Sequence, residues 1–399
     1  MSFLTRHLLI PAALLLCLGC TRTESMNSLT DRVFTLAQTQ LPLLSESLSD
    51  TNTPRSLDKD GNLVTADIGW WCSGFLPGSL WYTYEYTGNE KIRDLAAKES
   101  HKLDSLLVRT KPDHDLGFQL NCSYGNAFRA TGEAAWRALP EAGARVLAAR
   151  FSPQAGVLRS WNHNNGGQWR FPVIIDNMMN LELLMRFGDE DCREIALKHA
   201  RTTARNHFRP DGTSYHLVDY DPETGAVRGK QTVQGLSDDS AWARGNAWGL
   251  YGYTMMYELS GEADMLAQAE LIARALLPRL PEDGIPYWDF DDPEIPDALR
   301  DASAGAIMAS ALIRLGGLTG DRGLARACRR VAERQLRTLA SPAYLAAPGE
   351  LHGFLLRHGV GHKPAGSEID VPLTYADYYF LEALLLYNIC IRYCRSTNR

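Results

Sequence analysis

Residues 239–279 read DSAWARGNAWGLYGYTMMYELSGEADMLAQAELIARALLPR. The first half, 239–259, is apolar on almost every side of a helix, so it requires burial all round. Gly261 then breaks the chain, and the second half, 262–279, opens with acidic residues and keeps one polar face. An apolar helix followed at once by an amphipathic one predicts a helical hairpin with an inner and an outer member.

The same hairpin pattern recurs along the chain. Gly88, Gly188 and Gly320 each end an apolar helix and precede an acidic first turn, as Gly261 does. Six inner and outer pairs closed into a ring give an all-α (α/α)6 barrel in a single domain, which is the fold we expect. The apolar periodicity predicts helices over 28–47, 74–87, 89–109, 119–131, 133–150, 176–187, 189–208, 239–259, 262–279, 302–317, 321–340 and 372–393.

Long connections rich in aromatic residues and glycine separate several of these pairs. They cover 151–175, 209–238, 280–301 and 341–371. Connections of this length in a compact domain are usually functional. We expect them to gather at one mouth of the barrel.

Composition excludes two classes of partner. The chain has 399 residues, of which 45% are hydrophobic and 22% charged, and its formal net charge is −6. A protein that binds nucleic acid or an anionic membrane surface normally carries a basic stripe, and no Lys/Arg-rich block is present. An anionic substrate would have to be held by a few placed cations or hydroxyls.

The N-terminus has the form of an export signal. Arg6 and His7 precede an apolar run over 8–18, which is too short to span a bilayer, and the run ends in Leu18-Gly19-Cys20. This resembles a bacterial lipoprotein signal, although Cys17 stands where such signals usually carry Leu. The predicted organisation is a signal peptide over 1–19, a short tether over 20–27 with Cys20 lipidated, and a catalytic domain over 28–396. The expected location is periplasmic, or anchored at the outer membrane by the lipid alone.

Several segments combine aromatic, amide and carboxylate side chains in a way that core packing does not require. This mixture is typical of sugar-binding sites, because the C–H faces of a sugar pack on aromatic rings while its hydroxyls form hydrogen bonds with polar groups. The segments are 70–75, 113–118, 160–162, 176–180, 215–216, 231–239, 242–248 and 362–370.

These segments, in this order, resemble glycoside hydrolase family 88, the unsaturated glucuronyl hydrolases. The motifs are W-x-S-G-F-x-P-G from Trp71, H-D-L-G-F from His114, D-x-M-M-N from Asp176, W-A-R-G-x-A-W from Trp242 and H-K-P from His362. The resemblance implies an (α/α)6 barrel and a hydrolase that releases a 4,5-unsaturated uronic acid from lyase-generated oligosaccharides, such as glycosaminoglycan disaccharides. A related family acts on unsaturated rhamnogalacturonides from pectin and is the alternative.

The resemblance also assigns site residues. Asp176 matches the catalytic acid/base, and Asp115 matches the second catalytic carboxylate. Asn246 and Leu76 depart from the family pattern, which usually has Gln and often Trp there. Residues that fall where the family contacts substrate are Trp71, Trp161, His216, Gln234, Arg244 and Trp248, and we add Lys363 and Ser367.

The implied chemistry explains these residue types. The unsaturated ring is an enol ether, so one carboxyl can donate a proton to C4 and then assist the addition of water at C5. Such a group needs a raised pKa. Asp176 follows the apolar run 173–175 and precedes two methionines, so burial should raise its pKa, and an ionised Asp115 nearby would raise it further. Arg244 and Lys363 are the expected partners of the substrate carboxylate.

Structural roles for these residues remain open at this point. Asp176 could cap the helix that follows it, Asp115 could belong to a turn, and His216 could be a core histidine. Arg244 and Lys363 could instead pair with Asp238, Asp239 or Asp370. The sequence predicts no metal site and no cofactor. A lipid-anchored glycan-binding protein without activity is the third function class.

Overall fold

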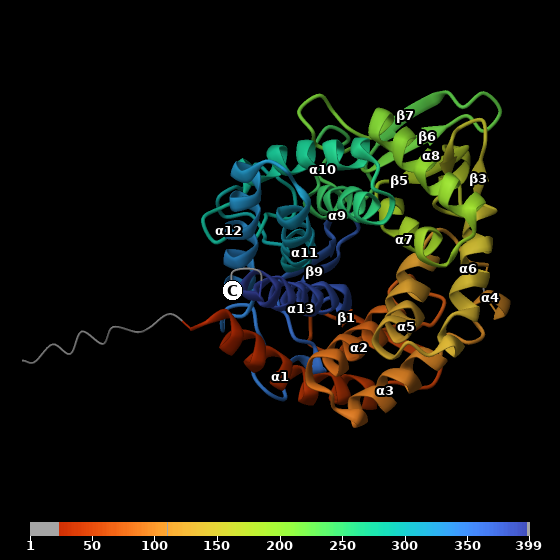
Figure 1. Ribbon diagram of the computed structural model, residues 1–399. Helices are drawn as coiled ribbons and strands as arrows, with labels where there is room; N and C mark the ends of the chain where they lie inside the picture. The colour runs from red at the N-terminus through yellow and green to blue at the C-terminus, as the bar shows by residue number, and fades with distance from the viewer. Residues whose placement is uncertain (1–23, 110, 397–399) are drawn as a thin grey trace, which may run out of the picture.

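The computed structural model describes residues 24–109 and 111–396, which form a double ring of helices (Figure 1). Neighbouring inner helices contact one another all the way round, and the last, α13, packs against the first, α2, to close the ring. The inner ring comprises α2 (Phe75–Thr87), the π-helix η1 (Gly117–Gly125) continued by α5 (Asn126–Thr131), α7 (Asn177–Phe187), α9 (Ala243–Ser260), α11 (Ala302–Leu318) and α13 (Thr374–Ser396). The outer ring comprises α1 (Met26–Glu46), α3 (Glu90–His101), α6 (Ala138–Ala148), α8 (Glu190–Asn206), α10 (Ala263–Leu276) and α12 (Arg322–Leu339). The predicted (α/α)6 barrel is confirmed.

Burial separates the two rings as the sequence predicted. Helix α9 is buried from Ala243 to Met256 without interruption, whereas α10 buries only one stripe of residues at helical spacing. Its buried positions are Met265, Ala269, Ile272, Ala273 and Leu276. An inner helix is enclosed by neighbours on all sides, while an outer helix keeps one face in water.

Some predicted boundaries differ from the observed ones. The segment predicted as one helix over 89–109 is divided, because α3 ends at His101 and the short α4 covers Leu106–Arg109. Between them the chain tightens into turns, and Leu103 and Leu106 remain in the core. The predicted helix 239–259 begins only at Ala243. The 3-10 segments are η2 (Ala134–Trp136), η3 (Asn165–Gly167), η4 (Leu277–Arg279), η5 (Leu351–Gly353) and η6 (Lys363–Ala365).

The N-terminal boundary also shifts. Helix α1 begins at Met26, where the Ser25 side chain accepts a hydrogen bond from the backbone N–H of Ser28 at 3.1 Å. The first helix of the barrel therefore starts two residues earlier than predicted. The predicted signal peptide 1–19 and residue Cys20 lie outside the described residues. None of the helices described is long and apolar enough to cross a membrane.

A nine-residue π-helix, η1, forms the start of the second inner helix. Such helices are rare and are frequent at functional sites. Two glycines allow η1 to pack closely against α7 on one side and α2 on the other. A Cβ added at Gly117 would lie 2.4 Å from the Asn180 Cα on α7. One added at Gly74, before α2, would lie 2.1 Å from the Phe118 carbonyl oxygen. The two glycines thus hold α2, η1 and α7 together.

The long connections contain small antiparallel hairpins. Strand β1 pairs with β2, β3 with β4, β8 with β9, and β6 lies between β5 and β7. The strands are β1 (Asn52–Leu57), β2 (Leu63–Asp67), β3 (Phe151–Ser152), β4 (Val157–Leu158), β5 (Phe171–Ile174), β6 (Leu217–Tyr220), β7 (Val227–Gln231), β8 (Gly359–His362) and β9 (Ser367–Val371).

Three of the four long connections, 151–175, 209–238 and 341–371, line one cavity at the N-terminal ends of the inner helices. We call this end the front mouth. The fourth, 280–301, lines no part of that cavity but supports it, because Trp288 packs with Trp242 and Val360. The hairpin connection 51–73, of which the sequence singled out only the end from Trp70, contributes to the front mouth as well.

An aromatic plug fills the middle of the barrel. It consists of Phe75, Phe118, Trp248 and Tyr379. Their rings follow one another around the barrel axis, and the centroids of neighbouring rings lie 5.2–6.1 Å apart. All four are buried. The plug separates the front mouth from a second opening, the rear mouth, at the C-terminal ends of the inner helices.

Candidate active site

The front mouth holds a cavity of about 310 Å³. Asp176 directly precedes α7, Arg244 is the second residue of α9, and Tyr375 is the second residue of α13. The cavity therefore faces several helix N-termini, whose partial positive charge favours an anionic ligand. Its lining residues are Arg55, Trp70, Trp71, His114, Asp115, Phe118, Trp161, His163, Ile174, Asp176, Val233, Gln234, Arg244, Gly361, His362, Glu368 and Tyr375.

Asp176 does not act as a helix cap. It stands at the first position before α7, but its side chain makes no capping hydrogen bond, and its Oδ2 is buried without a hydrogen-bond partner among the described residues. Burial raises its pKa to about 6, although Arg244 and Trp248 act in the opposite direction. A carboxyl that has one buried oxygen without a hydrogen-bond partner, faces a cavity and titrates near neutral pH is typical of a general acid/base.

His216 presents a proton donor to this carboxyl. Its Nδ1 accepts the backbone N–H of Val233 at 2.9 Å, so the neutral ring must carry its proton on Nε2. That nitrogen lies 3.8 Å from Asp176 Oδ2, and neither atom has a hydrogen-bond partner in the described part of the chain. Burial lowers the pKa of His216 well below its usual value, so the ring stays neutral. The gap between the two atoms is wide enough for a substrate oxygen or a water to bridge them.

Asp115 lines the same cavity, which brings the two predicted carboxylates together. Its backbone N–H donates to Asp113 Oδ1 at 3.0 Å, and His114 Nε2 lies 3.4 Å from its Oδ1. Burial, Asp113 and Asp176 all raise the pKa of Asp115 well above its usual value. Both carboxyls of the pair therefore have raised pKa values, and the direction for Asp115 is opposite to the one that favours an ionised group.

Arg244 is a buried cation in the cavity wall. Its NH2 donates to the Gly361 carbonyl at 2.6 Å, and its NH1 lies 3.4 Å from Asp301 Oδ2. It therefore has an acidic partner, but a different one from the three considered in the sequence. These contacts tie α9 to strand β8 and hold the guanidinium close enough to lower the pKa of Asp176.

The other predicted contact residues divide into three groups. Trp71, Trp161 and Gln234 line the cavity. His216 does not line the cavity and lies beside Asp176, with its Nε2 3.8 Å from Oδ2. Trp248 is fully buried in the plug and contacts Phe118, so it supports the floor rather than the open surface.

Lys363 and Ser367 do not line the cavity. The Lys363 amine lies 3.2 Å from Asp292 Oδ2 and 3.7 Å from Glu294, and it covers the ring of Trp288. Ser367 opens strand β9 and pairs with His362. Lys363 therefore has a structural role in an ion pair. The sequence left such a pairing open, but with Asp238, Asp239 or Asp370 rather than with Asp292 and Glu294.

The cavity lining also includes Arg55, His163 and Tyr375, which lie outside every segment singled out in the sequence, and Glu368, which lies in segment 362–370 but was given no role. Arg55 Nε donates to Glu368 Oε1 at 2.7 Å, and its guanidinium covers the ring of Trp70. Arg55 and Glu368 are more than three hundred positions apart, so no local motif could connect them. His163 stacks on Trp161, and this W-x-H spacing is the one signal that could have identified it.

Residues 47–386 match the sequence profile of Glycosyl Hydrolase Family 88. The chain belongs to this family. It is 41% identical over 350 residues to an unsaturated glucuronyl hydrolase of Formosa agariphila, with 86% of each chain covered. It is 36% identical to one from a Bacillus species, covering 83% of this chain and 90% of the relative.

Solved structures agree with the family assignment. The crystal structure of an unsaturated glucuronyl hydrolase specific for heparin superposes with a TM-score of 0.88 at 43% identity, covering 92% of this chain and 98% of that one. The family predicted from the motifs is thus confirmed, and the chain is a glycoside hydrolase.

One residue of this family 88 enzyme, Arg150, joins two loops that carry site residues. It lies just beyond α6, and its side chain donates four hydrogen bonds of 2.8–3.1 Å. One loop leads into Asp115, and the other contains Trp161. The acceptors are the backbone oxygens of Pro112, Arg159 and Ser160 and the side chain of Asn162.

We therefore expect Arg150→Lys to lower kcat/KM by about 10- to 100-fold, because lysine cannot span both loops and small misplacements of reacting groups have effects of this size. Steady-state kinetics, with circular dichroism to verify folding, measure the effect. Arg145→Lys, at an exposed position on α6, is the matched control and should behave as wild type. Unchanged kinetics for Arg150→Lys would show that the loops hold their positions without it.

Proposed function

We propose that the enzyme removes a 4,5-unsaturated uronic acid from the non-reducing end of glycosaminoglycan fragments produced by lyases. The observation that carries this proposal is the Asp176 carboxyl, whose Oδ2 is buried without a hydrogen-bond partner among the described residues, at a cavity that faces helix N-termini. The relatives support the substrate class. One, from Streptococcus pyogenes and 31% identical, is an unsaturated chondroitin disaccharide hydrolase. A Streptococcus agalactiae structure at 28% identity is complexed with dGlcA-GalNAc6S.

The first step is proton transfer from Asp176 to C4 of the unsaturated ring. The C4=C5 electron pair forms the new C4–H bond, and the positive charge that develops at C5 is shared with the ring oxygen. Asp176 becomes a carboxylate, and the nearby Arg244 stabilises its negative charge.

Water then completes the reaction. It adds to C5 and gives its proton to the Asp176 carboxylate, which restores the acid. The Nε2–H of His216 is placed to donate a hydrogen bond to this water. The product is a hemiketal: its C5–O5 bond breaks to give a ketone at C5, and the hemiacetal left at C1 expels the next sugar as an alcohol. No nucleophile attacks C1, so the paired-carboxylate geometry of ordinary glycosidases is not needed.

Asp115 and Arg244 position the substrate in this scheme. With its raised pKa, Asp115 can keep its proton and donate a hydrogen bond to a ring hydroxyl. Arg244 and the helix N-termini attract the uronate carboxylate.

The pH dependence follows from the acid form of Asp176. Because the protonated carboxyl is required and its pKa is about 6, kcat/KM should fall as the pH rises through that value. We expect about a tenfold loss for each pH unit above it. A pH profile of kcat/KM measures this, since kcat/KM reports groups of the free enzyme. A profile that stays flat between about pH 5 and pH 8 would contradict the assignment.

An absorbance assay tests the proposed reaction. The unsaturated ring absorbs ultraviolet light, and hydration removes that band. We expect loss of absorbance with unsaturated glycosaminoglycan disaccharides and not with an unsaturated rhamnogalacturonan disaccharide. Turnover of the pectin fragment alone would establish the alternative substrate, and binding without loss of absorbance would establish a glycan-binding protein.

We also propose that the enzyme is exported and anchored through a lipid on Cys20, on the strength of the signal-like segment 1–20. Cys20→Ser should move the protein from the membrane fraction to the soluble fraction. A wild-type protein that is already soluble would overturn the anchor.

A further inference from the structure

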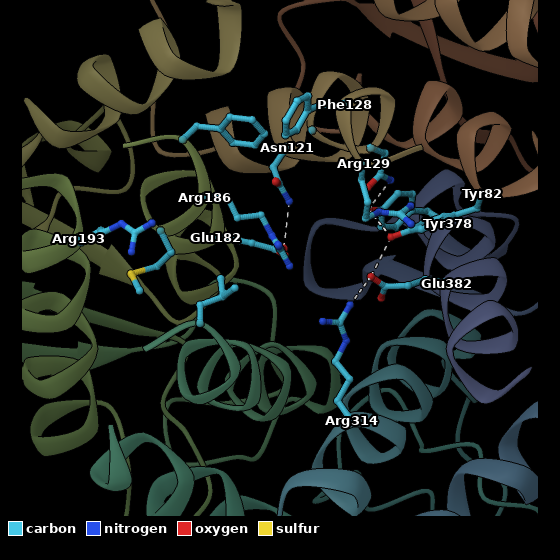
Figure 2. Close-up of a pocket in the computed structure, with 15 residues that line it drawn as sticks. Tyr82, Asn121, Phe128, Arg129, Glu182, Arg186, Arg193, Arg314, Tyr378 and Glu382 are labelled. Carbon is cyan, nitrogen blue, oxygen red and sulfur yellow. Dashed lines mark hydrogen bonds and ion pairs between the residues drawn. The ribbon is translucent and has the colours of Figure 1, made fainter. Parts of the chain in front are cut away.

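A second cavity, of about 370 Å³, opens at the rear mouth of the barrel (Figure 2). It shares no lining residue with the front cavity. On α13, Tyr375 lines the front, Tyr379 belongs to the plug and Glu382 lines the rear. The rear cavity is therefore a separate site, and its size falls within the range of about 300–1,000 Å³ typical of ligand pockets.

Cationic side chains outnumber anionic ones in its lining. Four guanidinium groups, those of Arg129, Arg186, Arg193 and Arg314, face two carboxylates, Glu182 and Glu382. Figure 2 shows Arg186 and Glu182 on one side of the central space and Arg314 and Glu382 on the other.

Both carboxylates already have their hydrogen bonds. Glu382 accepts from the hydroxyls of Tyr82 at 2.8 Å, Tyr251 at 2.9 Å and Ser310 at 2.6 Å, and from Arg314 at 2.9 Å. Glu182 accepts from Asn121 at 3.0 Å and from Arg186 Nε at 2.7 Å. Neither has an oxygen that could serve a cationic ligand well.

The guanidinium groups, by contrast, keep free donors. Arg186 uses only its Nε, and the Arg193 side chain has no ion pair or hydrogen bond to any described residue. The buried Nε of Arg314 has no partner in that part of the chain. Arg129 and Arg314 also pair outside the cavity lining, with Glu85 and Glu258 respectively. The unused donors belong mainly to Arg186 and Arg193.

Stabilisation of helix C-termini would be the simplest structural role for these arginines. None of the four, however, donates a hydrogen bond to a backbone carbonyl among the described residues, and the helix ends are capped by backbone N–H groups such as those of Gly88 and Gly188. The local potential is positive as well. Burial alone would raise the pKa of Glu182, yet Arg186, Arg314 and Arg129 lower it below its usual value.

Apolar side chains complete the lining. Phe128 and Phe187 form an aromatic pair with centroids 6.2 Å apart, and Met185 and Leu259 are also part of the wall. A ligand that satisfies such a cavity has an anionic group for the free guanidinium donors and a ring whose C–H face packs on the aromatic side chains.

We propose that the rear cavity binds an acidic monosaccharide, with its carboxylate held by Arg186 and Arg193 and its ring packed against Phe128 and Phe187. This site is independent of the proposed reaction, because it uses no residue of the front cavity.

Calorimetric titration with saturated glucuronate tests the site. This probe has no C4=C5 bond and is not consumed by the proposed reaction. In Arg186→Gln/Arg193→Gln, we expect the rear component of binding to weaken at least about tenfold, because the double substitution removes the charge-assisted hydrogen bonds to the carboxylate. The matched control is Arg322→Gln/Arg326→Gln on α12, which removes the same charge at exposed positions outside both cavities and should leave binding unchanged.

A neutral sugar and an inorganic anion test separately whether the carboxylate and the sugar ring are recognised. Glucose has a similar ring without the carboxylate, and sulfate is an oxyanion without the ring; both should bind more weakly than glucuronate. Equal glucuronate affinity in wild type and Arg186→Gln/Arg193→Gln would overturn the site. Glucose or sulfate binding as tightly as glucuronate would overturn the acidic sugar as ligand. Circular dichroism and the single variant Arg193→Gln, at an exposed and unpaired position, ensure that misfolding does not produce the loss.

Discussion

Asp176→Asn is expected to lower kcat by at least about a thousandfold while the barrel stays folded. The amide has nearly the shape of the carboxyl but cannot donate a proton to C4 or accept one from water, and loss of one acid/base commonly costs about 10²–10⁴ in rate. Folding should be unaffected, because the side chain makes no capping hydrogen bond and its Oδ2 has no partner among the described residues. The absorbance assay and circular dichroism measure the two quantities.

Asp239→Asn is the matched control for that experiment. It makes the same chemical change at an exposed position of the connection before α9, outside the cavity lining. Wild-type turnover is expected from this control. If Asp176→Asn turned over at a similar rate, Asp176 would not be the acid.

Gly117→Ala is expected to destabilise the enzyme by about 3 kcal/mol and to lower kcat/KM by about 100-fold. The new Cβ would lie 2.4 Å from the Cα of Asn180 and 2.6 Å from its Oδ1, so the backbones of η1 and α7 must separate. That separation disrupts the 3.0 Å hydrogen bond from the Phe118 N–H to Asn180 Oδ1. It also displaces Asp115, two residues away, relative to Asp176.

Chemical denaturation and steady-state kinetics together measure this effect. Gly317→Ala, in helix α11, is the control, because a Cβ there meets no atom within 4 Å. Alanine is about 1 kcal/mol better than glycine in a helix, so this control should be neutral or stabilising. Equal stability of the two variants would mean that the contact between η1 and α7 adapts without cost.

The ring of helices was predictable because its signals are local. Inner helices such as 239–259 are apolar on almost every side, outer helices such as 262–279 have one apolar stripe, and Gly88, Gly188 and Gly261 mark turns between them. A residue's periodicity and its cap depend on neighbours a few positions away. The short motifs that carry Asp115 and Asp176 were visible for the same reason.

The remainder of the site depends on contacts between distant segments. Nothing near Arg55 in the sequence points to Glu368, and nothing near Lys363 points to Asp292. The π-helical start of η1 was likewise invisible, because its cause is the packing of Gly117 against α7. The pKa shifts of Asp115 and Asp176 depend on how deeply each carboxyl is buried, which only the assembled barrel determines.

Helix α13, the last helix of the chain, is needed to complete both cavities. It supplies Tyr375 to the front and Tyr378 and Glu382 to the rear, and it contacts both α1 and α2 from the opposite end of the chain. A polypeptide still attached to the ribosome, with its last segment inside the exit tunnel, therefore has an open curve of helices and neither binding site complete. A proteolytic cut just before α13 would therefore disable both sites at once.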